Sequence, residues 1–198
     1  MKPETSCLEE FLTSTDVIDW SGTAVEEKSH ELTMGLSNDI EKAVVLFNWV
    51  RDAIPHSKDI APNLVTCSAT EVLAEGTGIC FAKSHLLAGM LRAQKIPTGF
   101  CYQTLTMDAP FTGMTLHGLN GVYLHSLEKW ARVDPRGNTG NCDAQFSIGE
   151  ERLAFEMDPQ KGEFIYDEIF SKPAKNVVDA LRKFDSRVEL WSNLPSVL

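Results

Sequence analysis

The stretch that most constrains the fold of this chain runs from Cys80 to Gln94, "CFAKSHLLAGMLRAQ". Its large apolar residues occupy much of a helical circumference: Phe81, Leu86, Leu87, Met90 and Leu91. Small residues lie between them and allow close approach of other elements. A helix that is apolar on most sides has to be covered on most sides. We therefore expect this helix at the centre of a domain.

Further helices are expected on the N-terminal side of this segment. Residues 38–54 repeat apolar positions at helical spacing, and Asn38 with Glu41 has the spacing of a capping box. Residues 68–76 show the same start pattern and end in glycine, which predicts a short helix. Residues 1–35 are expected to be irregular apart from one short helix.

After Pro97 the hydrophobic pattern changes to the alternation of strands. Residues 163–170 are a further candidate strand. Helices followed by a sheet predict an α+β fold, with an antiparallel meander packed on the central helix. The three segments expected to form this meander are 98–107, 115–124 and 129–135.

Length and composition limit the organisation and the classes of partner. A chain of 198 residues fits one domain, 1–198, with a core at about 38–145 and a C-terminal helical extension at about 171–195. Its formal charge of −10 disfavours a nucleic-acid or anionic-membrane binder. We see no signal peptide or membrane span, so we expect a cytoplasmic protein. Its five cysteines form no zinc-site spacing, so we expect no metal.

Cys80 opens the central helix directly after the "GTG" turn at residues 76–78. Unpaired backbone N–H groups and the helix dipole stabilise a thiolate at such a position, and the same N–H groups could hold an oxyanion. Taken alone, a cysteine here is more often a small core residue, because free cysteine is among the most buried residue types. Whether Cys80 reacts therefore depends on a base within reach.

His117 is the histidine best placed to be that base. Within residues 115–124 the odd-numbered side chains, including His117, point to one side of their strand. Within 129–135 the even-numbered side chains, including Asp134, point to one side of theirs. A hairpin loop of even length pairs odd residues with even ones. We therefore predict Cys80 as nucleophile, His117 as general base and acid, and Asp134 as the group that orients the imidazole.

The sequence leaves the length of the hairpin loop open. A loop of residues 125–126 sets His117 directly opposite Asp134. A loop of 125–128 makes the two diagonal, still within about 7 to 8 Å. A loop of 126–129 places Asp134 opposite Gly121, and any odd loop puts the pair on opposite faces.

Three segments together resemble the core of the transglutaminase-like superfamily, a branch of the papain-like cysteine enzymes. They are "GTGICFAKSHLLAGMLRAQKIPTGF", "LHGLNGVYL" and "KWARVDPRGN", and the similarity runs over residues 43–138. It implies the triad Cys80, His117 and Asp134 on a papain-like core. It also implies cofactor-free acyl transfer, in which an amide or acyl group of a peptide, protein or small molecule forms a thioester on Cys80 and passes to water or an amine.

The chain departs from the family pattern around the expected pocket. It has Leu119 where tryptophan is frequent, and Phe81 and Ala82 directly after the cysteine. One alternative is an arylamine N-acetyltransferase-like enzyme, which shares the order of catalytic residues. This chain is short for that family and has "EGTGIC" in place of an Arg-Gly-Gly lead-in. A second alternative is a non-catalytic binding module, which would have no need of all three triad residues.

Other polar residues are weaker candidates for the site. His56 follows Pro55, where enzymes of this superfamily can place a side chain near the cleft, but we expect it to be a solvated loop histidine. His85 lies on a different helix face from Cys80, so it should not be its base. Asn120 and Gln103 are possible oxyanion donors without strong support. The turn-rich segment after Asp134 is expected to be a surface connection and contains three polar residues: Arg136, Asn138 and Asp143.

Overall fold

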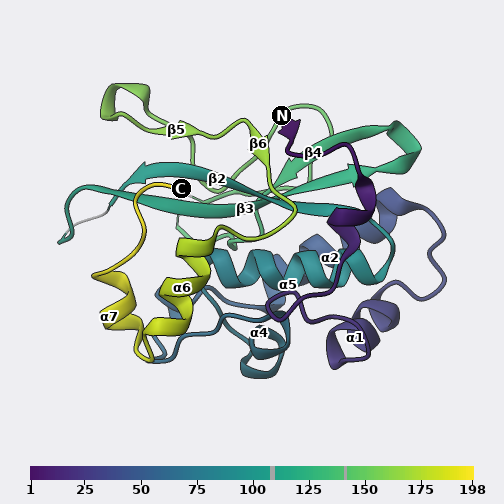
Figure 1. The fold of residues 1–198 in the computed structure, drawn as a ribbon, viewed down its shortest axis with the longest axis horizontal. Coiled ribbons are helices and arrows are strands. Elements are labelled where there is room, and N and C mark those ends of the chain that lie inside the picture. The colour runs from purple at the N-terminus through teal and green to yellow at the C-terminus, as the bar shows by residue number, and fades with distance from the viewer. Residues whose placement is uncertain (108–109, 141) are drawn as a thin grey trace.

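The computed structural model describes residues 1–107, 110–140 and 142–198 of the chain (Figure 1). It has an α+β fold, as the sequence predicts. Helix α5, Cys80–Ala93, lies under an antiparallel sheet whose strand order is β4-β3-β2-β5. Figure 1 shows the sheet on one side of α5 and helices α1 and α4 on the other.

Every residue of α5 is buried, which confirms its predicted central place. The burial includes four polar side chains on the helix, those of Lys83, Ser84, His85 and Arg92. The main hydrophobic core surrounds α5 and also takes in Val177 of the C-terminal helices. The helix that begins with Cys80 is therefore held on all sides.

Side-chain caps set the start of the helices that the sequence predicts. Asn38 accepts hydrogen bonds from the backbone N–H groups of Ile40 and Glu41 and starts α2. Ser68 and Glu71 form a complete capping box at α4. No helix within the described ranges is both long and apolar enough to cross a membrane. The helices besides α5 are α1 Ala24–Leu32, α2 Asp39–Ala53, α3 Ser57–Ile60, α4 Ala69–Glu75, α6 Lys175–Lys183 and α7 Arg187–Trp191, with 3₁₀ helices η1 Leu8–Leu12, η2 His125–Leu127 and η3 Pro159–Lys161.

Helix α1 corrects the expectation that residues 1–35 are irregular beyond one short helix. Its only buried residues are Val25 and Ser29, so it lacks the apolar periodicity that reveals longer helices. Its N-cap, Thr23, accepts a hydrogen bond from the Val25 N–H. Thr23 followed three residues later by Glu26 is the sequence signal that could have revealed it.

The antiparallel meander is confirmed, and the candidate strand at 163–170 is wrong as a single element. That segment forms two short strands in two different sheets. One pairs with β2, and the other pairs in parallel with the first residues of the chain. The strands are β1 Lys2–Pro3, β2 Thr98–Thr106, β3 Met114–Leu124, β4 Lys129–Val133, β5 Phe164–Ile165 and β6 Glu168–Ile169.

The β3–β4 hairpin settles the register that the sequence leaves open. Leu124 pairs with Lys129 and Asn120 with Val133, so the loop consists of residues 125–128. This is the even-length alternative that places Asp134 diagonal to His117, two residues along the strand from the directly opposed position. The two side chains therefore share one face.

A tight approach at Gly99 of β2 leads to a stability prediction. A Cβ atom there would lie 2.6 Å from Ile169 Cγ2 and 2.6 Å from the backbone oxygen of Phe170. Gly99→Ala should therefore lower the free energy of unfolding by about 1–3 kcal/mol in urea titrations. Gly149→Ala is the matched control, because its Cβ would meet nothing within 4 Å. Equal losses in the two variants would contradict the packing argument.

Candidate active site

Cys80 lies at the first position of α5 and borders the main cavity. Its N-cap residue, Ile79, provides no side-chain cap, and only 9% of Cys80 is exposed. The cavity has a volume of about 520 Å³. Its walls come from the N-terminus of α5, strands β2 and β3, the segment around Phe155, and helix α7. This cavity therefore gives a substrate access to the Cys80 side chain.

His117 of β3 borders the same cavity and is held firmly in place. Its Nε2 donates a hydrogen bond of 2.8 Å to Asp134 Oδ2. The ring of Phe155 packs edge-on against it, with centroids 5.0 Å apart and planes at 90°. Because Nε2 is used by the carboxylate, Nδ1 is the ring nitrogen that is left for another partner.

Asp134 lies directly behind the imidazole and is fully buried. Besides His117, its Oδ2 accepts a hydrogen bond from the Ala154 N–H at 3.0 Å. Its Oδ1 accepts one from the Arg136 N–H, also at 3.0 Å. Three donors therefore satisfy this carboxylate and fix its position in the absence of water.

The charges of this cluster favour an ionised pair. Burial alone lowers the pKa of His117, but the Asp134 carboxylate and the nearby Cys80 sulfur outweigh it and raise that pKa to about 10. Burial raises the pKa of Asp134, while His117 and the two backbone N–H groups more than offset this and hold it below its ordinary value. The imidazole is therefore protonated at neutral pH.

The structure thus brings the three predicted residues together at one end of the cavity. Cys80 and His117 border the same cavity, and Asp134 is bound to the far side of the imidazole ring. In chain order, the cysteine starts helix α5, the histidine lies on strand β3 and the aspartate directly follows strand β4.

Residues 26–135 match the model of the transglutaminase-like superfamily. The chain belongs to this superfamily. A comparison with curated proteins finds no match.

Three solved structures are also similar to this chain. A candidate cysteine protease from Cytophaga hutchinsonii aligns with a TM-score of 0.53 and 15% identity, covering 67% of this chain and 43% of its own. A candidate protease from Parabacteroides distasonis aligns with a TM-score of 0.43 and 15% identity, covering 66% of this chain and 28% of its own. A TGase aligns with a TM-score of 0.40 and 17% identity, covering 63% of this chain and 33% of its own. The chain therefore spans less than half the length of each of these proteins.

His56 corrects another expectation about this transglutaminase-like site. It is not a solvated loop histidine, since only 4% of it is exposed and it borders the main cavity. Its Nε2 lies 3.1 Å from the backbone nitrogen of Cys80, and its Nδ1 lies 3.1 Å from that of Lys58. The place of His56 directly after Pro55 allows a side chain near the cleft by resemblance to the family, and the structure bears out this reading instead of the solvated one.

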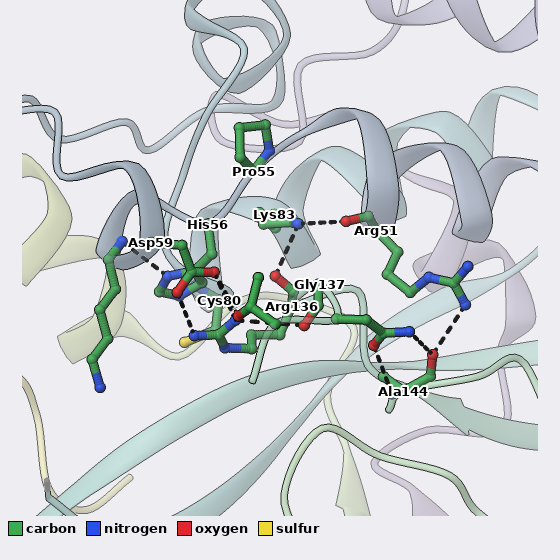
Figure 2. A network of polar contacts seen from close by, with 12 residues as sticks. Arg51, Pro55, His56, Asp59, Cys80, Lys83, Arg136, Gly137 and Ala144 are labelled. Carbon is green, nitrogen blue, oxygen red and sulfur yellow. Dashed lines mark hydrogen bonds and ion pairs between the residues drawn. The ribbon is translucent and has the colours of Figure 1, made fainter. Parts of the chain in front are cut away.

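Lys83 ties three segments together beneath the site, as Figure 2 shows. Its Nζ donates hydrogen bonds to the backbone oxygens of Arg51, Ile54 and Arg136. Burial lowers its pKa to about 7, although the Asp134 carboxylate acts in the opposite direction. The lysine therefore links the end of α2 to the loop that follows Asp134.

Arg136 lies at the cavity, although its segment was expected to be a surface connection. Only 6% of it is exposed, and its guanidinium binds both carboxylate oxygens of Asp59 at 2.9 and 3.0 Å. Figure 2 shows this pair beside Cys80. Asn138 is exposed and binds Ala144 of the same loop, so only Arg136 contributes to the site.

The remaining candidates do not face the nucleophile. Asn120 donates to the backbone oxygens of Ser84 and Gly99, and Gln103 donates to that of Phe155. His85 is buried on α5 against the Cys67 carbonyl, consistent with its exclusion as the base. Within the described part of the chain, no three His, Cys, Asp or Glu side chains are grouped so that they could hold a metal ion.

Asp134 and His117 should stabilise the fold over a limited pH range. The contribution of Asp134 is present above its ordinary pKa of about 4 and is lost on acidification. That of His117 is complete below about pH 6.5 and is lost as the pH rises through its folded-state value of about 10. In urea titrations, Asp134→Asn should therefore cost most free energy of unfolding between about pH 5 and 6.5, and clearly less near pH 10. A pH-independent loss would contradict this charge pairing.

Removal of the Lys83 ammonium should destabilise the protein. Lys83→Met leaves three buried carbonyls without a donor, and one such group costs about 1–3 kcal/mol. A loss of at least this size is expected in the free energy of unfolding. The control is Lys175→Met, because Lys175 is exposed and forms only a surface pair with Asp179, worth at most about 0.5 kcal/mol. Similar losses in both variants would contradict the role of Lys83.

Proposed function

We propose that this chain is a cysteine-dependent acyl-transfer enzyme. The observation that carries the proposal is the buried His117, which is bound through Nε2 to Asp134 and borders the same cavity as Cys80 at the start of α5. In the first half-reaction the Cys80 sulfur attacks the carbonyl carbon of an amide or ester. The protonated His117 then gives its Nδ1 proton to the departing amine or alcohol, and an acyl thioester remains on Cys80.

The second half-reaction returns the enzyme to its starting state. Water or an amine attacks the thioester carbon, and His117 Nδ1 accepts the proton of this nucleophile. The C–S bond breaks and leaves the sulfur as a thiolate beside the imidazolium. Asp134 keeps the ring in place and stabilises its positive charge in both steps.

The cavity supports a peptide or a small amide as substrate. Its volume of about 520 Å³ lies in the usual range for small-molecule sites. Within the described part of the chain, apolar side chains such as Phe81, Leu116 and Trp191 line it together with three basic and three acidic residues. The charged residues are Lys58, Arg136, Lys161, Glu156, Asp158 and Glu163.

Alkylation by iodoacetamide tests whether Cys80 is an activated nucleophile. Cys7 is exposed and provides an internal comparison in the same molecule. At pH 7, Cys80 should react faster than Cys7 despite its burial, because His117 acts as the base for its sulfur. In His117→Ala the rate at Cys80 should fall by about tenfold or more and rise with pH as for an ordinary thiol. Peptide mass spectrometry gives both rates.

A transfer assay follows the acyl group itself. Incubation with p-nitrophenyl acetate should release p-nitrophenolate and add one acetyl group at Cys80, which hydroxylamine removes. Cys80→Ser is the control and should not turn over. A stable acetyl adduct from acetyl-CoA would favour the arylamine N-acetyltransferase-like alternative. If Cys80 reacts no faster than Cys7 and no adduct forms, the chain is a binding module and not an enzyme.

A further inference from the structure

The two ring nitrogens of His56 both face backbone N–H groups. Nδ1 lies 3.1 Å from the Lys58 nitrogen, and Nε2 lies 3.1 Å from the Cys80 nitrogen. A neutral imidazole has one nitrogen that accepts and one that carries a proton. Only one of the two contacts can therefore be an N–H···N hydrogen bond, and at the other contact two donors face each other.

The local structure favours Nδ1 as the acceptor. His56 is the N-cap residue of α3, and its Nδ1 accepts from Lys58 in the usual geometry of a helix cap. The proton then lies on Nε2, next to the N–H of Cys80. Two N–H groups that point into one space without an acceptor between them are a site for an oxygen that carries negative charge.

We propose that His56 Nε2–H and the backbone N–H of Cys80 together form the oxyanion hole of this enzyme. The inference rests on the proposed function and names the donor that the sequence did not reveal. As the Cys80 sulfur attacks, the carbonyl oxygen of the substrate becomes an oxyanion and accepts both hydrogen bonds. No bond to His56 forms or breaks, and the charge of the oxyanion itself selects the Nε2–H form.

Burial and neighbouring charges keep His56 in the neutral form that this role needs. Burial is the main cause that lowers its pKa well below the ordinary value, and the charges of Arg136, Lys83 and His117 lower it further. Asn120 and Gln103, the side chains considered from sequence, donate their hydrogen bonds elsewhere. His56 also borders the cavity through which the substrate must come.

Two substitutions separate the two nitrogens of the ring. In His56→Asn the side-chain amide matches the position of Nδ1, so the cap on α3 is kept and the donor near Cys80 is lost. In His56→Gln the amide nitrogen matches Nε2, so the donor is kept and the cap is weakened. His125→Asn, at an exposed histidine of the β3–β4 loop, controls for substitution itself.

Each variant is measured in two reactions of Cys80. Acylation by p-nitrophenyl acetate passes through an oxyanion, whereas alkylation by iodoacetamide does not. For His56→Asn we expect acylation to fall about 100-fold or more, with alkylation within about threefold of wild type. His56→Gln should recover at least about tenfold of the lost acylation, and His125→Asn should match wild type in both reactions.

Three results would overturn the role of His56 while the proposed function stands. They are unchanged acylation in His56→Asn, equal losses of acylation and alkylation in that variant, and no recovery in His56→Gln. Unchanged or faster acylation would mean that Nε2 accepts from Cys80 and occupies its N–H. Equal losses would mean that His56 only positions the thiolate. If instead wild-type Cys80 is inert in both reactions, the proposed function fails and the role of His56 fails with it.

Discussion

The polar side chains buried on α5 hold the rest of the molecule in place. Lys83 binds the end of α2 and the loop after β4, His85 binds the segment before α4, and Arg92 binds three further backbone oxygens. An unpaired buried charge would cost several kcal/mol. These segments therefore cannot move away from α5 independently. Cys80 is the first residue of the same helix, so its position relative to these segments is fixed as well.

The parts of the fold that could be predicted depend on local chemistry. The capping box at Ser68 sets the start of α4, and the all-round apolar pattern places α5 at the centre. Alternation alone puts His117 and Asp134 on one face for any even loop. The actual loop length could not be predicted, because it depends on a 3₁₀ turn and a left-handed Glu128 that carry no strong sequence signal. The diagonal pairing nevertheless gives a 2.8 Å hydrogen bond.

The parts that could not be predicted depend on where distant segments return. His56 lies 24 residues before Cys80, and only the path of α3 brings its ring to the helix terminus. Arg136 follows Asp134 in a turn that resembles a surface loop in sequence, yet Asp59 of α3 anchors it beside the cavity. Helix α1 was missed for another reason, since it buries too little apolar surface to show a period. Sequence patterns thus indicate which residues could react and do not show what surrounds them.

The two buried histidines at this cavity, His117 and His56, differ in protonation state because their surroundings differ. Burial alone lowers the pKa of His117, but the bound Asp134 carboxylate and the charge of the Cys80 sulfur raise it to about 10, so the ring holds a proton at neutral pH. Burial lowers the pKa of His56 well below its ordinary value, and the charges of Arg136, Lys83 and His117 lower it further, so it stays neutral. One ring can then transfer protons while the other only donates a hydrogen bond, a division of roles that environment sets. The positive charges near His56 that keep its ring neutral would also stabilise an oxyanion bound beside the ring. The same charges therefore favour both the neutral hydrogen-bond donor and its negatively charged acceptor.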